Sequence, residues 1–272
     1  MKNRPRRVVI TPIYNESRVL ADILALIEKE ADLVIAVDDC STDDTPRILS
    51  QWRDGNDRAI VIRSKKNGGA SVALRKGYAL VDHFHATGAL EGDDLVVEID
   101  SDGQHDPKYI RELCDLFESY GGKIDVVLGR RDFSVYPLYK VLGNKGLTIA
   151  ASILGGFLYK DVESNFRAMR VSSFRELLKW YGGYKYSGAF EVGIILAHLG
   201  YRTDNNHIIE VPTYRHGAGF MDGFHVLSMG IIARWRLLIR REIPDNQSFR
   251  EQMLAELTAP PWYPGGKAPA PK

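Results

Sequence analysis

The stretch that decides the fold is Val96-Val97-Glu98-Ile99-Asp100-Ser101-Asp102-Gly103-Gln104-His105-Asp106-Pro107. Its apolar run stops at two aspartates one residue apart, which predicts a buried strand whose carboxyl end carries Asp100 and Asp102. Open α/β sheets bind ligands outside that end of their strands. Mg²⁺ and Mn²⁺ prefer oxygen ligands, and Mg²⁺ usually binds one or two carboxylates together with substrate phosphates. The pattern therefore favours a metal-bound diphosphate site, although Asp, Ser and Gly also form ordinary turns.

Short β-rich runs alternate with helical patterns through the first half of the chain. The predicted strands are 7–12, 33–37, 59–62, 95–99 and 124–128, and the predicted helices are 17–30, 43–52, 69–82 and 107–120. This alternation predicts an α/β fold with a mostly parallel, doubly wound sheet and helices on both faces. A polar cluster follows each predicted strand, and in such a sheet these clusters share one edge. The clusters are Tyr14-Asn15-Glu16, Asp38-Asp39, Asn67-Gly68-Gly69, Asp100-Ser101-Asp102 and Arg130-Arg131.

The second half of the chain is less regular. Apolar helical patterns cover 139–158, 171–181 and 190–199, a polar junction covers 161–170, and 208–212 is a predicted strand. We predict one main domain over 1–220 and a C-terminal amphipathic helical segment over 221–258. The end of the chain, 259–272, is rich in Pro, Gly, Ala and Lys and is predicted to be disordered.

Composition narrows the class of protein. The chain has 272 residues, 44% of them hydrophobic, which fits one sizeable globular domain with an appendage. Its 36 Lys and Arg nearly balance 35 Asp and Glu, so the charge does not favour nucleic acid as a partner. Cys40 and Cys114 match neither a zinc spacing nor a disulfide framework, which indicates a reducing compartment. Because the first residues also lack the apolar core of a signal peptide, we expect a cytoplasmic protein.

Two apolar stretches, 146–159 and 224–239, bear on membrane contact. The first is too short to span a bilayer. The second contains Arg234, Trp235 and Arg236, and a helix that is apolar, aromatic and basic can lie in a membrane interface. A helix that packs on the core explains the same pattern. Peripheral contact with the inner face of the membrane and ordinary packing are therefore both open.

Four motifs resemble those of the family 2 glycosyltransferases with the GT-A fold. They occur in family order between about Val8 and Gly219. The resemblance therefore implies a GT-A catalytic domain over 1–220. The motifs are Thr11-Pro12-Ile13-Tyr14-Asn15-Glu16, Val37-Asp38-Asp39-Cys40-Ser41-Thr42-Asp43-Asp44-Thr45, Asn67-Gly68-Gly69 with Ala73 and Gly77, and Asp100-Ser101-Asp102-Gly103-Gln104-His105-Asp106-Pro107.

Within that family the chain is most similar to the polyprenol-phosphate sugar transferases, the branch that includes the dolichol-phosphate mannose synthases. The resemblance extends to Gly129-Arg130-Arg131, Gly143-Asn144-Lys145, Ser164-Asn165-Phe166-Arg167-Ala168 and Glu210-Val211-Pro212. Two departures are visible. Asn165 replaces a glycine that the branch usually has, which alters the expected acceptor pocket. The stretch Tyr214-Arg215-His216-Gly217-Ala218-Gly219-Phe220 lacks the usual lysine, which weakens the expected cationic contact there.

The resemblance implies a nucleotide sugar donor, GDP- or UDP-linked, and a bound Mg²⁺ or Mn²⁺. The implied metal ligands are Asp100, Asp102 and Gln104, with Asp102 also catalytic. Asp39 would accept from the nucleobase, whereas Asp38 is either a second contact or a cap of the following helix. The full set predicted to bind the nucleotide sugar is Pro12, Tyr14, Glu16, Asp38, Asp39, Gly69, Arg75, Asp100, Ser101 and Arg215.

The acceptor implied by the closest branch is a polyprenyl phosphate. Arg131 and Arg167 are predicted to bind its phosphate, because arginine makes bidentate contacts with phosphate; ordinary ion pairs are the alternative. A phosphate is already anionic, whereas a sugar hydroxyl needs a general base. Glu191 is the candidate base if the acceptor is a hydroxyl of a glycan, and is otherwise a buried structural carboxylate. A nucleotide-binding module without transferase activity is the remaining alternative.

Overall fold

The five strands predicted in the first half of the chain all belong to one seven-stranded sheet with the order β3-β2-β1-β4-β7-β5-β8. The structure is a computed structural model, and it describes residues 4–212, 220–243 and 246–258. The strands are β1 (Arg7–Ile13), β2 (Leu33–Asp38), β3 (Ala59–Arg63), β4 (Leu95–Glu98), β5 (Val126–Leu128), β7 (Arg167–Arg170) and β8 (Thr203–Asp204). A separate two-stranded sheet joins β6 (Arg130–Arg131) to β9 (Ile208–Ile209).

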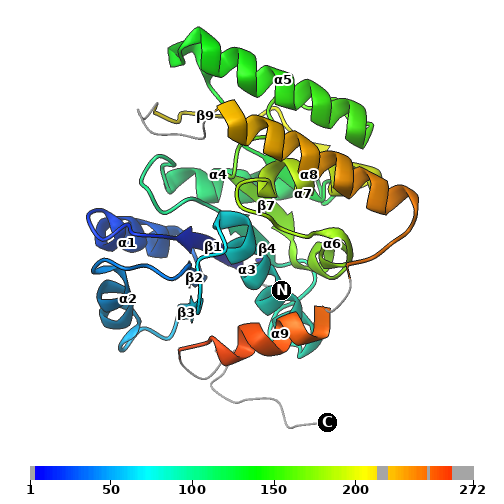
Figure 1. The fold of residues 1–272 in the computed structure, drawn as a ribbon. Coiled ribbons are helices and arrows are strands. Elements are labelled where there is room, and N and C mark those ends of the chain that lie inside the picture. The colour runs from blue at the N-terminus through cyan, green and yellow to red at the C-terminus, as the bar shows by residue number, and fades with distance from the viewer. Residues whose placement is uncertain (1–3, 213–219, 244–245, 259–272) are drawn as a thin grey trace.

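Helices cover both faces of the sheet, as predicted (Figure 1). One face packs against α1 (Leu20–Glu30), α2 (Thr45–Arg53) and α4 (Lys108–Ser119). The other face packs against α3 (Ala70–Ala86), α6 (Phe174–Trp180) and α7 (Gly188–His198). Two single 3₁₀ turns, Phe133–Val135 and Val171–Ser173, lie between α3 and α6 along the chain. Three more helices lie outside this layer: α5 (Leu138–Gly155), α8 (Phe220–Leu238) and α9 (Asn246–Ala255).

The strand order places the predicted motifs together. β1 pairs in parallel with both β2 and β4, so the segments that follow these three strands are neighbours at one edge of the sheet. Every residue of β2 and β4 is buried, as expected for parallel strands covered on both faces. The prediction of a mostly parallel, doubly wound sheet is confirmed.

The polar junction predicted over 161–170 contains a central strand instead. β7 runs antiparallel between β4 and β5, and its register places Arg167 opposite Glu98. Its sequence, Arg-Ala-Met-Arg, appears polar because two of its four residues are arginines. Arg167 is nevertheless buried, because the carboxylate of Glu98 neutralises its charge inside the core.

The predicted C-terminal segment 221–258 consists of two helices in different places (Figure 1). α8 packs on α5 and α7, whereas α9 packs on α3. Gly230 lets α8 approach α7 closely, since a Cβ there would lie 2.1 Å from Cε1 of Phe190. Within the described residues no helix combines the length and the apolar character needed to cross a bilayer. The predicted disordered end, 259–272, lies outside the described residues.

Candidate active site

Side-chain hydrogen bonds tie the segments after β1 and β2 into one unit. The Asn15 N–H donates to Oγ of Ser41 at 2.9 Å, and the Thr42 N–H donates to Oδ1 of Asn15 at 2.8 Å. The Glu16 N–H donates to Oγ1 of Thr45 at 3.0 Å. Asn15 has φ 57°, in the left-handed region where non-glycine residues are uncommon. Such backbone strain clusters at functional sites, and here it fixes the direction in which Tyr14 and Glu16 project.

Three residues predicted to contact the donor serve this framework in the structure. Ser101 is buried, and its hydroxyl donates to the carbonyl of Pro12 at 2.8 Å, which joins the aspartate motif to β1. Asp38 is also buried; it accepts from the Ser41 N–H at 2.9 Å and lies 3.4 Å from Nε of Arg63. Both side chains thus have contacts that support the loops, and their role as direct nucleotide contacts stays a prediction.

Asp39 organises the third loop of the edge. Its carboxylate accepts from the Gly68 N–H at 3.0 Å and from the Gly69 N–H at 2.6 Å. Gly69 has φ 88°, and a Cβ there would lie 2.8 Å from Cα of Lys185, so only glycine fits. Tyr14 is 47% exposed beside these loops and is available to a nucleobase or ribose.

Three carboxylates gather at the carboxyl ends of β1 and β4. The pKa of Glu16 is raised to about 7 by burial and by the negative charges of Asp102, Asp43 and Asp100. Burial likewise raises the pKa of Asp100, and burial together with Asp100 raises the pKa of Asp102. Among the described residues, no lysine or arginine forms an ion pair with any of these three. The site therefore carries negative charge that no direct ion pair with a described lysine or arginine neutralises, although Arg131 and Arg167 oppose the rise in the pKa of Asp100 from a distance.

These oxygen ligands fit a hard divalent cation that is coordinated partly by the protein and partly by a substrate. Asp100 and Asp102 offer carboxylate oxygens, and the Gln104 N–H donates to Oδ1 of Asp102 at 2.9 Å, which keeps Gln104 beside them. No three His, Cys, Asp or Glu side chains of the described residues converge closely enough to hold a metal alone. Phosphate oxygens commonly complete such a coordination shell. The residues present thus fit Mg²⁺ or Mn²⁺ bound jointly with a diphosphate.

His105 and Asn165 hold Asp100 from the protein side. Nδ1 of His105 lies 3.7 Å from Oδ2 of Asp100, and Nδ2 of Asn165 donates to the same oxygen at 3.5 Å. Burial lowers the pKa of His105 to about 4, so this ring is neutral at pH 7. Asn165, which replaces the glycine usual in the related branch, is therefore a neighbour of the predicted metal ligand. Sequence reasoning noted the replacement but not this contact.

The two arginines predicted to bind an acceptor phosphate are both paired within the protein. Nε of Arg167 lies 2.9 Å from Oε2 of Glu98, and each side chain is only 1% exposed. This ion pair gives Arg167 a structural role beneath the site, and its binding of an acceptor phosphate stays a prediction. Arg131 lies closer to the surface, where Nε and Nη2 donate to Asp161 at 2.8 Å each and Nη2 also donates to Asn144 on α5.

Glu163 is a charged residue beside Arg131 that the sequence did not single out. Its Oε1 is buried and has no hydrogen-bond partner among the described residues. Burial raises the pKa of this carboxyl to about 7, against the opposing influence of Arg131. The sequence around Glu163 is polar and does not predict burial. The stretch 161–166 is buried in part because it leads into β7, a central strand of the sheet.

Glu191 is buried at the start of α7. Oε1 accepts from the Gly182 N–H at 2.8 Å, and Oε2 accepts from the Gly183 N–H at 3.2 Å. Nη1 of Arg236 on α8 lies 3.6 Å from Oε1. These contacts fit the structural alternative rather than that of a general base.

Two further predicted donor contacts have different outcomes. The guanidinium of Arg75 lies 4.1 Å from the centre of the Phe249 ring of α9 and donates to the Gly182 carbonyl at 3.5 Å. Arg75 thus contacts α9 and the Gly182 backbone, and its role as a donor contact stays a prediction. Arg215 lies outside the described residues.

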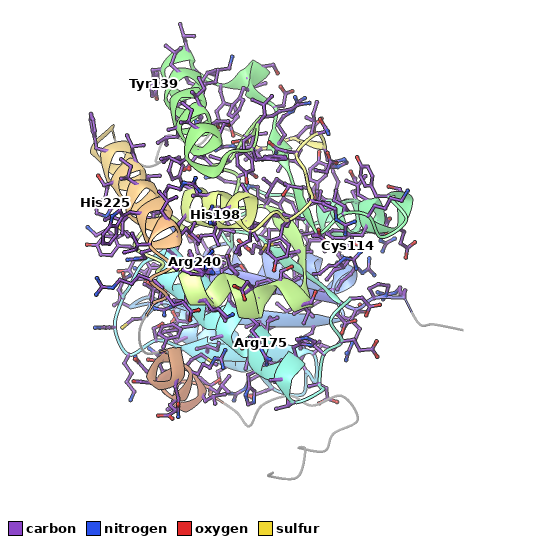
Figure 2. The ribbon with its side chains drawn as sticks, turned by 90° about the vertical axis from the view of Figure 1, so that its right-hand side faces the viewer. Cys114, Tyr139, Arg175, His198, His225 and Arg240 are labelled. Carbon is purple, nitrogen blue, oxygen red and sulfur yellow. The ribbon has the colours of Figure 1, made fainter. Side chains whose placement is uncertain are left out.

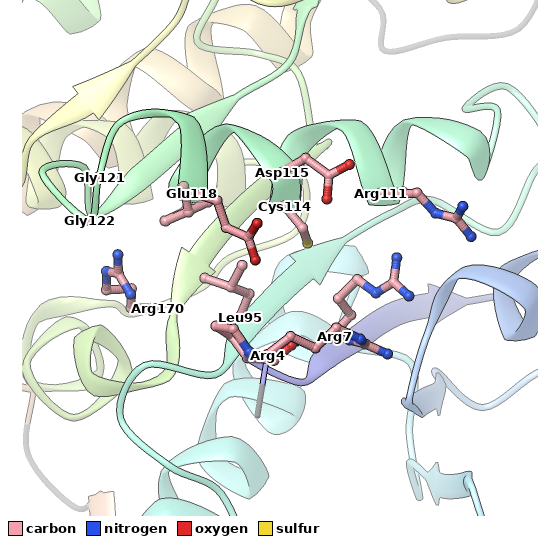
Figure 3. Close-up of a pocket in the computed structure, with 12 residues that line it drawn as sticks. Arg4, Arg7, Leu95, Arg111, Cys114, Asp115, Glu118, Gly121, Gly122 and Arg170 are labelled. Atoms are coloured by element: carbon pink, nitrogen blue, oxygen red, sulfur yellow. Dashed lines mark hydrogen bonds between the residues drawn. The ribbon is translucent and has the colours of Figure 1, made fainter. Parts of the chain in front are cut away.

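A cavity of about 450 Å³ lies elsewhere, at the amino ends of β1 and β4 and against α4 (Figure 3). Its lining includes four arginines, which outnumber the two carboxylates Asp115 and Glu118; the arginines are Arg4, Arg7, Arg111 and Arg170. Burial raises the pKa of Cys114 in its wall to about 12, which keeps the thiol protonated. Ligand chemistry in this fold is expected at the opposite ends of the strands, where the carboxylates lie.

Comparisons with known proteins agree with this geometry. The profile of glycosyl transferase family 2 matches residues 8–178. The chain is 29% identical over 249 residues to the UDP-N-acetylglucosamine–dolichyl-phosphate N-acetylglucosaminyltransferase of Methanococcus voltae, which covers 80% of this chain and 92% of that protein. It is 27% identical over 261 residues to the undecaprenyl-phosphate mannosyltransferase of Micrococcus luteus, which covers 87% of this chain and 98% of that protein.

The fold has solved counterparts. Glucosyl-3-phosphoglycerate synthase from Mycobacterium tuberculosis superposes with a TM-score of 0.58 at 22% identity, covering 89% of this chain and 82% of that one. A mannosyltransferase from Pyrobaculum calidifontis, solved with GDP-Man and Mn²⁺, superposes with a TM-score of 0.54 at 20% identity, covering 92% and 69%. At these identities the likeness concerns the fold alone. The match of the family profile to more than half of the sequence, on a sheet that places its motifs at one edge, means that this chain belongs to glycosyl transferase family 2 and is a glycosyltransferase with the GT-A fold.

Proposed function

We propose that this glycosyltransferase moves a sugar from a UDP- or GDP-sugar to a polyprenyl phosphate with inversion at the anomeric carbon. The observation that carries the proposal is the group of three carboxylates, Glu16, Asp100 and Asp102, at the carboxyl ends of β1 and β4, none of which forms an ion pair with a described lysine or arginine. Relatives that span 80% or more of the chain are named as transferases that act on dolichyl or undecaprenyl phosphate.

The donor would lie across the loops that follow β1, β2 and β3. Tyr14 is exposed for stacking, and Asp39 fixes the backbone of Gly68 and Gly69. Asp100, Asp102 and Gln104 would hold Mg²⁺ or Mn²⁺ together with the diphosphate. A divalent cation in this place supplies Lewis-acid stabilisation of the charge on the leaving nucleoside diphosphate. Two solved structures of the same fold were determined with Mn²⁺ and a nucleotide or nucleotide sugar, which supports this assignment.

The acceptor would approach from the side of Arg131. Nε and Nη2 of this side chain are fixed by Asp161, so the guanidinium is held in one orientation at low entropic cost to a ligand. An arginine pre-positioned in this way suits a phosphate. A phosphate acceptor needs no general base, which agrees with the engagement of Glu191 by Gly182 and Gly183.

Lipid access is supported by a face that we call the α5–α8 face. It consists of the outward side chains of these adjacent helices (Figure 2). Its exposed apolar members are Leu138, Tyr139, Leu142, Ile149, Ile153, Phe224, Ile231, Ile232, Trp235 and Leu238. The sequence has no Asp or Glu over 138–160 or 223–241, but it has lysines in the first stretch and arginines in the second. Apolar, aromatic and basic residues on one face suit the interface of an anionic membrane, so we propose peripheral contact at its cytoplasmic side.

A direct assay tests the proposed reaction. Purified protein is mixed with radiolabelled UDP- and GDP-sugars, Mn²⁺ or Mg²⁺, and a polyprenyl phosphate in detergent. We expect metal-dependent transfer of label to the organic phase, with loss of the lipid product in Asp102→Asn. Transfer only to soluble glycans, with no lipid product, would overturn the lipid acceptor and favour the hydroxyl alternative. Nucleotide binding without any transfer to either class would leave a binding module.

A further inference from the structure

The C-terminal helix α9 and the residues after it close the β3 edge of the sheet. Ile62 of β3 pairs antiparallel with Leu257. The Arg63 N–H donates to the Glu256 carbonyl at 3.0 Å, and the Thr258 N–H donates to the Val61 carbonyl at 3.1 Å. The segment 246–258 is therefore part of the nucleotide-binding half of the molecule.

A buried ion pair lies where this segment meets α3. Nζ of Lys76 lies 2.5 Å from Oε2 of Glu256, and the two side chains are 5% and 1% exposed. Lys76 also donates to Oγ of Ser64 at 2.8 Å. The Lys65 N–H approaches the other oxygen of Glu256 at 3.4 Å. The pair thus touches both residues that begin the loop 64–69.

The far end of this loop belongs to the proposed donor site. Gly68 and Gly69 donate their N–H groups to Asp39, and Ser64 donates its N–H to the Asp38 carbonyl at 2.8 Å. The end of β2 therefore contacts both ends of the loop, and Lys76 and Glu256 add further contacts at the end that begins with Ser64. A displacement at Ser64 would be transmitted along only a few residues to the glycines.

Fold stability alone does not account for a buried Lys–Glu pair at this place. Removing two charges from water is costly, and an apolar pair of similar size is often as stable or more stable. What an apolar pair would not supply is the directed contacts to Ser64 and Lys65. These contacts are the reason to connect the pair with the geometry of the loop.

We propose that Glu256 and Lys76 are positioning residues for the donor. They hold the loop 64–69 in the conformation that presents Gly68 and Gly69 beside Asp39, so α9 sets the affinity for the nucleotide without touching it. The inference rests on the proposed function, because the ligand of this loop is taken to be the nucleotide of the donor.

The test uses the full chain with two variants and one control. Glu256→Gln removes the charge with little change in shape. The double variant Lys76→Met with Glu256→Met keeps apolar volume and leaves no unpaired buried charge, so it remains informative if the single variant fails to fold. Glu251→Gln, on the exposed side of α9, is the matched control. The measurements are the Kd for UDP and for GDP with Mn²⁺, donor KM and kcat, and hydrogen exchange of the Lys65, Gly68 and Gly69 amides.

We expect the Kd and the donor KM to rise about fivefold to tenfold in both variants, with kcat changed by less than about twofold. Amide exchange in the loop should become faster, and the control should match the wild type. Unchanged nucleotide affinity in a folded double variant, with only a lower melting temperature in Glu256→Gln, would reduce the pair to a structural role and overturn the inference. If the wild type binds neither UDP nor GDP, the proposed function fails first and this inference fails with it.

Discussion

At the scale of the residue, the buried carboxylates of the proposed active site destabilise the folded protein. Burial raises the pKa of all three carboxyls, Glu16, Asp100 and Asp102, and the charges of neighbouring carboxylates raise those of Glu16 and Asp102 further. The hydrogen bonds of Asn165 and Gln104 offset only part of this effect. A cation that binds the folded state would relieve the repulsion, and its stabilisation of the protein would grow with the logarithm of its concentration above Kd.

The first prediction concerns Asp102→Asn. Loss of one carboxylate should reduce sugar transfer by about 10²–10³-fold, because charge on the leaving group is then poorly stabilised. The same change should raise the melting temperature in metal-free buffer by about 2–4 °C, since it removes a repulsion. Calorimetry with and without Mn²⁺ measures the second effect.

Asp106→Asn is the control for this change, because Asp106 lies in the same loop but is exposed and paired with Lys108. It should change neither activity nor melting temperature appreciably. Full activity in Asp102→Asn would show that this carboxylate is not part of the metal site.

The second prediction concerns Glu163, whose carboxyl has a pKa raised to about 7 by burial, with Arg131, Asp161 and Arg167 as its charged neighbours. The folded state therefore holds the proton more tightly than the unfolded state, where the pKa is near 4.3. The stability that this group contributes is present below about pH 4.5 and is lost as the pH rises to about 7. Glu163→Gln does not titrate, so it should gain stability relative to the wild type over this range.

We expect the stability of Glu163→Gln relative to the wild type, measured as the difference in the free energy of unfolding, to be about 1–2 kcal/mol greater at pH 8 than at pH 5. Urea unfolding at both pH values measures it. Glu242→Gln, an exposed change, is the control and should show no such dependence. A difference that is independent of pH would mean that Glu163 is ionised throughout.

At the scale of the element, glycines decide how closely helices pack. The α8 helix crosses α7 at Gly230, where a Cβ would lie 2.1 Å from the Phe190 ring. Gly146 lies within α5 but has open space where its Cβ would be. Substitutions at these two glycines therefore distinguish two effects. Gly230 tests the requirement for close packing, and Gly146 tests only the cost of a glycine within a helix.

The third prediction is that Gly230→Ala destabilises the protein by about 1–3 kcal/mol, because α8 must move away from Phe190. Gly146→Ala should instead stabilise it by about 0.5–1 kcal/mol through helix propensity alone. Denaturant unfolding of both variants measures these changes. Equal effects in the two variants would contradict the close packing of α8 on α7.

At the scale of the whole molecule, the two C-terminal helices serve different ends of the protein. α9 closes the β3 edge, beside the proposed donor loop, whereas α8 joins α5 in an apolar and basic face. Arg131 is tied to this second region through Asn144 of α5. The proposed lipid acceptor would therefore reach the catalytic edge from the side of the α5–α8 face.

The fourth prediction is that Ile153→Glu and Trp235→Glu each weaken binding to vesicles containing anionic lipid by about tenfold, because each removes apolar burial and adds repulsion. Flotation of the protein with vesicles measures this, and activity on detergent-solubilised acceptor should remain. Leu26→Glu, at a 42% exposed apolar residue on α1, is the control. Binding by the wild type that is insensitive to all three changes would place the lipid contact elsewhere.

Much of the fold could be predicted from the sequence, because each strand and helix is indicated by the pattern of its own residues. Alternating apolar runs predict β1 to β5 and the helices between them, since each element buries a face defined by its own periodicity. Parallel strands then bring Tyr14, Asp39 and Asp100 to one edge without further information. β7 escaped prediction because a buried arginine is stable only opposite Glu98, which is 69 positions away.

By itself, then, the sequence determined the α/β class, the shared edge and the two acidic residues at its centre, because these depend on neighbours along the chain. Only the tertiary structure decided which charged side chains are available to a ligand. Ser101, Asp38, Arg167 and Glu191 are engaged by partners inside the protein, whereas Glu163 and the Lys76–Glu256 pair emerged only from packing. The physical reason is that burial and ion pairing depend on contacts between segments that are distant in the sequence, and local periodicity does not predict those contacts.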